Sequence, residues 1–594
     1  MSDYVAPVQD MLFTMQELAG LADVGKLPGW EEIGADLAEA VLDEAGRFAG
    51  EVLSPLNVVG DREGSRLVDG KVALPTGFAE AYRQFVDAGW SGIAAPAEFG
   101  GQELPQVLAK PVTEMWSSAN LSFSLCPMLT QGALKALLHH GSVDQQNAYL
   151  AKLVSGEWTG TMNLTEPQAG SDLAAVRSRA VPEGDHYRLF GSKIFITWGD
   201  HELTDNIVHL VLARLPDAPS GVKGISLFVA PKYLLNADGT AGARNDIQCV
   251  SLEHKLGIHA SPTAVLAFGE KEGAIGYLVG EPNCGLEYMF TMMNHARLGV
   301  GLEGVAIAER AYQQARDYAR ERVQGRAAGH DSAGPIIRHA DVRRMLLTMR
   351  AQTEAARAIA YVTASYMDLA ERHPEEAERQ RYQAVVELMT PVVKGWCTEM
   401  SQEVTSLGVQ VHGGMGFIEE TGAAQHMRDA RIITIYEGTT GIQANDLLGR
   451  KTLREQGRTL RLVIDEMRAD CARAHAVGGE HSRQLVSTLE AAIQSLETAT
   501  AYLLQVGGEA PLHALAGAVP YLMLVGTVFG GWQMLRAASA AQARIAAGEG
   551  TPFHRAKIDT ALFYATHILP RAAMNAEVVC HGAAATLAFE ESEF

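Results

Sequence analysis

The chain has 594 residues, 47% of them hydrophobic, and carries a formal net charge of −21. A chain of this length predicts several structural units with large cores, and its acidic balance gives no reason to expect nucleic-acid binding. The 6 cysteines have no CxxC spacing, which argues against a disulfide framework or a zinc module and favours a reduced compartment.

The N-terminal segment does not look like a targeting sequence. It carries acidic residues before any basic one and has no continuous apolar core. A secretory signal has the opposite pattern, and a mitochondrial presequence is rich in Arg and poor in acids. We therefore expect a cytoplasmic protein.

The spacing of apolar residues changes along the chain. Residues 30–160 have apolar positions three to four residues apart, which is typical of helices. Residues 185–270 contain short β-branched and aromatic runs bounded by Gly, Pro, Asp and Asn, which predict a small antiparallel sheet or barrel. Helical spacing returns at Gly285. The expected fold is mainly α with a central β domain.

A further block of helices is expected after residue 451. Ser482 is a candidate N-cap for one of them, because apolar residues follow it at helical spacing. Residues 514–535 carry no formal charge and are long enough to cross a bilayer, but Pro520, Gln533 and several glycines interrupt them. We expect a buried helix of a helical bundle here, with contact to a membrane surface as the alternative and no membrane span.

Three glycines at 299, 301 and 304 form a literal GxGxxG pattern. A dinucleotide-binding motif requires a strand before these glycines and a turn that leads into a helix. These glycines lie inside a helical run, so we expect them to allow close packing between helices. The chain has no HExxH or EF-hand pattern, and we expect no metal site.

Two segments have the composition of a ligand site. Residues 162–172, followed by 195–197, combine hydroxyl groups with a Gly-containing turn, which suits a polar ring edge or a phosphate. Residues 410–417 contain glycines that let backbone N–H groups approach a pyrophosphate. In residues 428–440, Glu437 follows an apolar run and precedes a glycine, so its carboxylate is a candidate base with a raised pKa.

These segments closely resemble the acyl-CoA dehydrogenase family of flavoproteins. LTEPQAGSD resembles the family's TEPGAGSD signature, QVHGGMGF its glycine motif, and MRDARIITIYEGTTGIQ the loop that carries its catalytic glutamate. The resemblance spans about residues 35–450 in the family's order. It implies an acyl-CoA dehydrogenase-like fold with a helical domain, an antiparallel β domain and a four-helix domain, followed by a C-terminal helical bundle.

The resemblance also implies domain boundaries and an assembly. We expect a helical domain over 1–160, a β domain over 161–280, a helical dehydrogenase domain over 281–450 and a bundle over 451–594. The N-terminal segment and the extension resemble a narrower bacterial branch described as 3-methylmercaptopropionyl-CoA dehydrogenase-like. In extended relatives, such a bundle covers the surface through which shorter members form tetramers. We therefore expect a homodimer.

The resemblance implies an FAD-dependent dehydrogenation of an acyl-CoA thioester to the trans-2-enoyl-CoA. Glu437 would abstract the α-proton while the β-hydrogen leaves as hydride to flavin N5, and electron-transferring flavoprotein would take the electrons. The backbone N–H of Glu437 and a ribityl hydroxyl would polarise the thioester carbonyl. Some members carry the base on the helix that contains Asn294, but the matching residue here is Ala296, which cannot accept a proton.

The resemblance assigns further contacts residue by residue. Thr165 and Thr197 would contact the polar edge of the isoalloxazine, with Phe195 against the ring. Arg322 and Gln410, with the following glycines, would reach the adenosine–pyrophosphate part of an FAD, often one held by the neighbouring subunit. The full set of cofactor contacts is Met162, Leu164, Thr165, Gly170, Ser171, Phe195, Ile196, Thr197, Arg322, Gln410, Gly413, Gly414 and Thr439. Substrate contacts are Ser171, Asn294, Arg297, Tyr436 and Gly438.

The chain departs from the family pattern at three places. Phe195 replaces the usual Trp, His412 replaces the usual Phe, and YARERVQGR is one residue shorter than the family motif. These changes concern the adenine-side contacts more than the base.

Several alternatives stay open. An acyl-CoA oxidase, which passes electrons to oxygen, uses the same scaffold, and a nucleic-acid-associated flavoprotein of the alkylation-response type would need a basic C-terminal domain that this acidic chain lacks. The acyl group can be a fatty acyl or a thioether acyl chain. The apolar residues around 118–137, among them Leu121, Phe123, Leu125 and Met128, are expected to line part of the acyl pocket.

Overall fold

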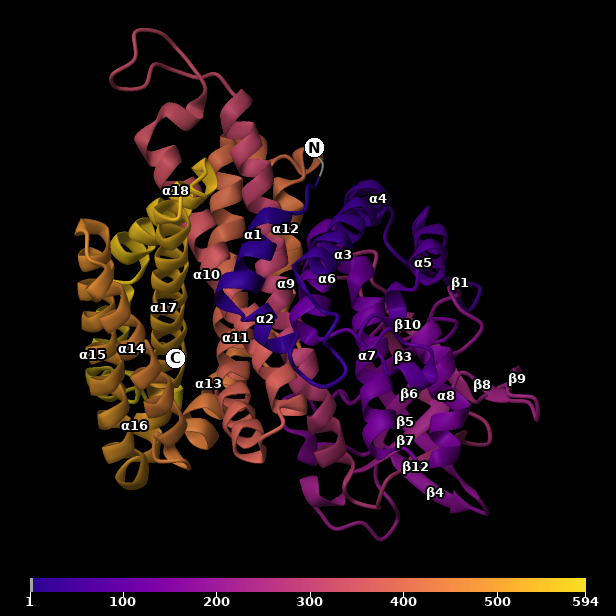
Figure 1. Cartoon of the computed structure of the whole chain (residues 1–594). Helices are drawn as coiled ribbons and strands as arrows, with labels where there is room; N and C mark the ends of the chain where they lie inside the picture. The colour runs from indigo at the N-terminus through magenta and orange to yellow at the C-terminus, as the bar shows by residue number, and fades with distance from the viewer. Residues whose placement is uncertain (1–3) are drawn as a thin grey trace. The chain divides into compact units, whose positions relative to one another are not determined.

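The computed structural model describes residues 4–594, apart from the side chains at 291, 292 and 294. Along the chain, a run of helices is followed by most of the strands and then by helices again (Figure 1). Its contacts divide into two compact units. We call Arg47–Leu104 with Ala119–Gly299 the sheet unit, and Met1–Gly46, Pro105–Ser118 and Val300–Phe594 the helical unit. The predicted fold class, mainly α with a central β domain, is confirmed.

The sheet unit is built on an eight-stranded sheet with the order β10-β11-β5-β12-β7-β6-β3, in which β4 also pairs with β5. The strands are β3 (Thr159–Asn163), β4 (Arg179–Glu183), β5 (His186–Thr197), β6 (Ile207–Ala213), β7 (Ser226–Pro231), β10 (Ile247–Leu252), β11 (Thr263–Phe268) and β12 (Ala274–Val279). Its pairs are antiparallel except for β3 and β6, which run parallel. β3, β4 and β12 lie outside the strand runs expected within residues 185–270. β3 has no alternating pattern, because all five of its residues are buried.

The same unit contains the helices α4 (Ser54–Glu63), α5 (Phe78–Asp87), α7 (Leu121–His140) and α8 (Val143–Ser155), with a hairpin of β1 (Arg66–Val68) and β2 (Lys71–Ala73) and a second of β8 (Tyr233–Leu235) and β9 (Ala241–Arg244). Of these helices, α7 packs on the sheet, mainly on β3. Asn120 caps α7 by accepting the N–H of Phe123 at 3.1 Å, and Ser142 with Gln145 forms a capping box on α8. A Cβ on Gly160 would lie 2.5 Å from that of Ala133, so β3 and α7 pack closely.

The helical unit consists of helices of 4 to 37 residues. They are α1 (Val8–Phe13), α2 (Leu21–Val24), α3 (Ala35–Phe48), α6 (Gln106–Ala119), α9 (Gly285–Glu321), α10 (Ala340–Arg372), α11 (Glu376–His412), α12 (Ala423–Ala430), α13 (Thr440–Asn445), α14 (Arg458–Val477), α15 (Glu480–Glu509), α16 (Pro511–Ala516), α17 (Ala518–Ala546), α18 (Pro552–Phe563), α19 (Arg571–His581) and α20 (Ala583–Thr586). α9 and α3 each cross a boundary between the two units. The predicted helical block after residue 451 corresponds to α14–α20, of which α14, α15 and α17 lie side by side in Figure 1. Ser482 does not cap α15, because the helix begins at Glu480 and Ser482 lies buried inside it.

The glycine pattern at 299–304 packs helices together, as predicted. A Cβ on Gly301 would lie 2.6 Å from the carbonyl oxygen of Val393, and one on Gly304 would lie 2.6 Å from that of Cys397. No side chain fits at either position, so α9 and α11 approach each other backbone to backbone.

Two helices, α7 and α17, are long and apolar enough to cross a membrane by length and composition alone. The most apolar windows of the two helices are 72% and 83% buried within the protein, as in the core helices of soluble domains. α17 packs against α11, where Gly526 lies against the ring of Trp396. The structure therefore buries the 514–535 segment within the bundle, as predicted.

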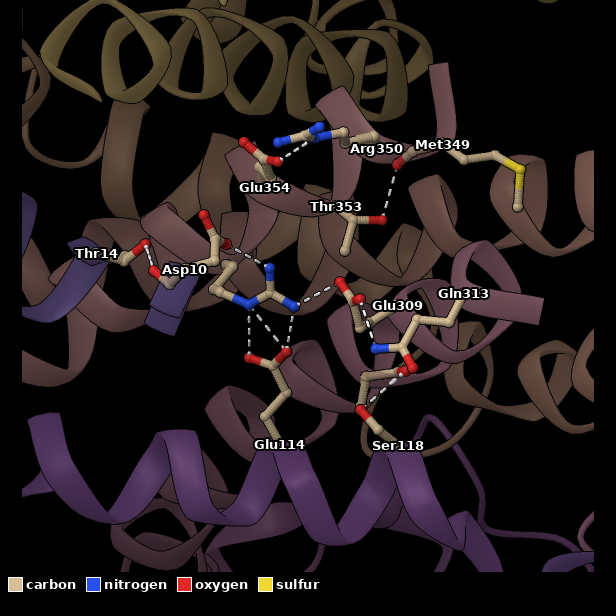
Figure 2. A network of polar contacts seen from close by, with 12 residues as sticks. Asp10, Thr14, Glu114, Ser118, Glu309, Gln313, Met349, Arg350, Thr353 and Glu354 are labelled. Atoms are coloured by element: carbon tan, nitrogen blue, oxygen red, sulfur yellow. Dashed lines mark hydrogen bonds and ion pairs between the residues drawn. The ribbon is translucent and has the colours of Figure 1, made fainter. Parts of the chain in front are cut away.

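A cluster of buried charges joins distant parts of the helical unit. Asp10, Glu114 and Glu309 each accept a hydrogen bond from the guanidinium group of Arg357, and we call this group the Arg357 cluster. Figure 2 shows the three labelled acids around one unlabelled guanidinium group. The three ion-pair distances are 2.7, 2.6 and 2.8 Å. Lys557 of α18 binds the same Asp10 at 2.7 Å. The N-terminal helix, α6, α9, α10 and the C-terminal bundle thus meet at paired charges.

Candidate active site

The predicted site residues fall into two groups, one in each unit. The sheet unit holds Met162, Leu164, Thr165, Gly170, Ser171, Phe195, Ile196, Thr197, Asn294 and Arg297, and the helical unit holds Arg322, Gln410, Gly413, Gly414, Tyr436, Glu437, Gly438 and Thr439. The side chain of Asn294 lies outside the described residues.

A buried ion pair shapes the loop that carries Thr165. Glu166 accepts hydrogen bonds from the N–H of Arg177 at 2.7 Å and from the N–H and hydroxyl of Ser178 at 3.0 and 2.6 Å. Lys193 on β5 lies 2.8 Å from the Glu166 carboxylate and also donates to the carbonyl of Leu164 at 3.1 Å. The backbone N–H of residue 194 donates to the carbonyl of Thr165 at 2.9 Å. The first end of the loop is therefore fixed to β5, and its other end, at Arg177 and Ser178, is fixed to Glu166.

The charges of this pair are strongly coupled. Burial alone would raise the pKa of Glu166, but Lys193 outweighs burial and lowers that pKa to about 2. Burial lowers the pKa of Lys193 to about 8, although Glu166 opposes it. At neutral pH we expect both groups to be charged, so the pair holds the loop electrostatically as well as by hydrogen bonds.

The end of β5 contains an irregularity at Phe195. The register between β5 and β11 shifts by one residue there, and Phe195 has a φ of +58° and a side chain that is 58% exposed. A bulky residue in the left-handed region is strained, and such strain clusters at functional sites. The bulge turns the ring of Phe195 outward between the buried neighbours Lys193 and Ile196.

The remaining sheet-unit residues differ in exposure. Met162 is buried at the end of β3, whereas Gly170 and Ser171 lie exposed in the turn beyond Thr165. Arg297 on α9 is a buried cation, 5% exposed. Of the residues expected in the acyl pocket, Leu121, Phe123 and Leu125 are buried on α7, and Met128 is half-buried.

Glu437 lies in a tightly held loop of the helical unit, just before α13. Its φ is +53°, and its side chain is half-buried. The amide of Gln443, which is fully buried, donates to the carbonyls of Glu437 and Gly438 at 3.3 Å each. Thr439 caps α13 by accepting the N–H of Ile442 at 3.3 Å. Because Gln443 fixes the carbonyls of both Glu437 and Gly438, this loop presents the Glu437 carboxylate from a strained, defined backbone.

A glycine-rich surface lies at the end of α11. Gly413 has a φ of +61°, and a Cβ on Gly413 or Gly414 would meet no atom within 4 Å. The ring of His412 stacks on Tyr318 of α9 at 4.5 Å, and burial lowers the pKa of His412. The neutral imidazole thus takes the place of the family's Phe in packing. The stack also brings the end of α9, which leads to Arg322, to the end of α11.

Each group has chemistry that fits part of a flavin dinucleotide. The open backbone at Gly413 and Gly414, with the exposed side chains of Gln410 and Arg322, suits a pyrophosphate and its attached nucleoside. The exposed ring of Phe195 and the half-buried hydroxyls of Thr165 and Thr197 suit a flat ring with a polar edge. Among the described residues, no group of three or more His, Cys, Asp or Glu side chains is arranged to hold a metal ion.

Three residues near these groups were missed in the sequence. Lys193 and Gln443 fix the two loops, and Glu303, 1% exposed on α9, accepts a hydrogen bond from the hydroxyl of Tyr436. The available signal was a polar side chain inside an apolar run, but the sequence does not show which distant group it meets.

Models of one protein family match most of the chain. They are described as the N-terminal domain of acyl-CoA dehydrogenase at residues 36–157, its middle domain at 161–270, its C-terminal domain at 283–451, and an acetyl-CoA dehydrogenase C-terminal-like domain at 463–590.

Individual proteins are similar over nearly the whole length. A 3-methylmercaptopropionyl-CoA dehydrogenase of Ruegeria pomeroyi is 54% identical, over 95% of this chain and 96% of its own. A butyryl-CoA dehydrogenase of Syntrophomonas wolfei is 34% identical, over 96% and 95%. The structure of an acyl-CoA dehydrogenase from Bacillus anthracis, solved in complex with FAD, has a TM-score of 0.74 at 22% identity and covers 96% of this chain and 91% of its own.

Proposed function

This chain belongs to the acyl-CoA dehydrogenase family, and on that premise we propose that Glu437 is the base that starts the oxidation of its substrate. Membership makes the protein an enzyme, an oxidoreductase and flavoprotein whose cofactor is FAD and whose substrate is an acyl-CoA thioester. When bound, FAD supplies flavin N5 as the acceptor of the β-hydrogen as hydride.

The strained loop at Glu437 is the observation that carries this proposal. Its carboxylate takes the α-proton of the acyl-CoA, and its backbone N–H polarises the thioester carbonyl as negative charge develops there. Gln443 holds the loop carbonyls, so the carboxylate keeps its orientation during the step. The product is the trans-2-enoyl-CoA.

The remaining predicted contacts complete the proposal. Thr165 and Thr197 bind the polar edge of the isoalloxazine and Phe195 covers the ring, while Arg322 and Gln410 bind the adenosine–pyrophosphate part. Met162, Leu164, Gly170, Ser171, Ile196, Gly413, Gly414 and Thr439 supply further cofactor contacts. Ser171, Asn294, Arg297, Tyr436 and Gly438 contact the substrate. The buried charge of Arg297 supplies the local cation that an anionic CoA needs in an acidic protein.

The 54% identical relative supports a proposal for the substrate. We propose a short acyl-CoA, with 3-methylmercaptopropionyl-CoA as the first to test and a short fatty acyl-CoA as the competitor. Electrons pass to electron-transferring flavoprotein, with oxygen as the alternative acceptor. We further propose a cytoplasmic homodimer with domain boundaries near residues 160, 280 and 450.

Anaerobic titration with a panel of acyl-CoAs tests the activity, because flavin absorbance bleaches when the substrate is oxidised. We expect the thioether acyl-CoA to bleach the flavin, and a panel that leaves it oxidised would contradict the proposal. Glu437→Gln should keep FAD and lose turnover, whereas Glu490→Gln, an exposed glutamate on α15, serves as the matched control. Comparing peroxide release in air with reduction of electron-transferring flavoprotein separates the two acceptors.

A further inference from the structure

A buried glutamate lies beside the loop that carries Glu437. Glu303 on α9 is 1% exposed, and its Oε2 accepts a hydrogen bond from the hydroxyl of Tyr436, the residue before Glu437. Its Oε1 is buried and has no hydrogen-bond partner among the residues that the structure describes. An ionised carboxylate in this place would keep one oxygen without a donor, which is costly in a dry interior.

The titratable groups that face Glu303 come from two elements. Lys394 lies buried on α11, and Tyr436 with Glu437 lies on the loop before α13. Burial raises the pKa of Glu303 to about 8, the Tyr436 hydrogen bond and Lys394 oppose that rise, and Glu437 adds to it. The close packing of α9 on α11 at Gly301 and Gly304 leaves no space for side chains between them.

We propose that Glu303 is a positioning residue: it stays protonated while Glu437 is ionised, and it holds the base-bearing loop through the hydroxyl of Tyr436. The inference rests on the proposed role of Glu437 as the base. Each of two neighbouring carboxylates disfavours the ionisation of the other, and the more buried one, Glu303, is the one that keeps its proton. With the proton on Glu303, the charge sits on Glu437, the group that must accept the α-proton.

Ionisation of Glu303 then has a defined consequence. A second negative charge appears close to the place where the thioester oxygen gains charge, and it disfavours the transition state. We expect the rate of flavin reduction in the native enzyme to fall as pH rises through about 8. The Glu303→Gln enzyme cannot ionise there, so its rate should show no such step.

Stopped-flow flavin reduction in a set of variants tests the positioning role. Glu303→Leu should slow reduction about tenfold, the effect of one lost hydrogen bond, and Tyr436→Phe should slow it equally. The double variant should be no slower than either single one, because both remove the same contact. Glu303→Gln keeps an acceptor for the Tyr436 hydroxyl and should recover most of the rate. FAD content, read from absorbance, should stay full throughout.

Thermal unfolding gives a readout independent of turnover. A carboxyl whose pKa is raised by folding contributes stability at low pH and loses it as pH rises toward the folded value. The Tm of Glu303→Gln should therefore increase relative to the native protein between pH 5 and about 8. Parallel Tm curves together with an unchanged pH–rate profile would overturn the inference.

The rates of the variants distinguish the role of Glu303 from the role of Glu437. A Glu437→Gln enzyme with full turnover would overturn the assignment of the base. Native rates in Glu303→Leu and Tyr436→Phe, beside an inactive Glu437→Gln, would overturn only the role of Glu303.

Discussion

Two glutamates of the same helix have opposite surroundings. Glu309 on α9 lies 2.8 Å from Arg357 and belongs to the Arg357 cluster, in which each buried acid faces a cation (Figure 2). Glu303, less than two turns earlier, has a phenol on one oxygen and no hydrogen-bond partner on the other among the described residues. Burial is nearly complete for both, so pairing, not exposure, separates them.

The degree of pairing distinguishes buried acids that act as structural charges from those that are candidates for reaction. Lys557 and Arg357 outweigh burial and hold the pKa of Asp10 well below its usual range, so Asp10 stays ionised and binds helices together, whereas burial raises the pKa of Glu114 in the same cluster. Beside the Glu437 loop, burial without a full set of partners moves the pKa of Glu303 toward the working range. A buried acid thus becomes a candidate for function where its neighbours leave it incompletely paired.

Breaking the Arg357 cluster should have the largest effect. Arg357→Met leaves three buried acids without their shared cation and should lower the free energy of unfolding by about 3–5 kcal/mol. Urea denaturation followed by circular dichroism measures this change. Arg468→Met, which removes an exposed pair with Glu497, should cost less than about 1 kcal/mol. Equal losses in the two variants would remove the distinction between paired buried and surface charges.

The same substitution at the two α9 glutamates should act in opposite directions. At pH 8.5, Glu309→Gln should destabilise the protein by about 1–3 kcal/mol, because it removes the charge opposite Arg357. Glu303→Gln should stabilise it by at least about 1.4 kcal/mol, the equivalent of one pKa unit, since the native carboxyl must ionise there. At pH 5 the gain from Glu303→Gln should be smaller, because most of the penalty develops as pH rises from the unfolded to the folded pKa. Chemical denaturation at both pH values measures the signs, and a shared sign would contradict the comparison.

The Glu166–Lys193 pair is a paired charge that serves a loop of the proposed flavin site. Lys193→Met should weaken FAD binding roughly tenfold, because the Leu164 carbonyl loses its donor and Glu166 its cation. Fluorescence titration of the apoprotein with FAD measures the Kd. Lys223→Met, at an exposed position of the same unit, is the control. An unchanged Kd for Lys193→Met would mean that the loop holds its shape without the pair.

Loss of the Gln443 contacts should have the smallest effect. These hydrogen bonds are long, 3.3 Å each, so Gln443→Leu should slow flavin reduction only about threefold. Stopped-flow absorbance measures the rate, with the exposed Gln494→Leu as control. A loss larger than that of Glu303→Leu would place the main support of the loop at Gln443 instead of Tyr436.

The sequence predicts those features that depend on local periodicity or on a motif. The order of helices, sheet and helices follows from apolar spacing, and the glycines at 299–304 were correctly assigned to helix packing. β3 has no such signal, since it is short, fully buried and paired with a strand far along the chain. The left-handed backbone of Phe195 and Glu437 depends on a bulge and a loop contact that residue types alone do not specify.

Pairs of residues that are distant in the sequence also limit how much of the site can be predicted. Glu303 and Tyr436 are 133 positions apart, and Arg357 and Asp10 are 347 apart. Sequence reasoning could place each residue on a helix or loop, but the partner that decides its charge state is fixed only by tertiary packing. For this reason the motif residues were found and the residues that support them were not.

The packing of α17 bears on any attempt to shorten the enzyme. Gly526 covers Trp396 of α11, and Lys557 supplies a cation to Asp10 and to Glu354. A protein cut after residue 450 would expose an indole to water and leave two carboxylates facing each other with one cation fewer. The C-terminal bundle is therefore an integral part of the enzyme's core, and we expect that it cannot be removed without destabilising the rest.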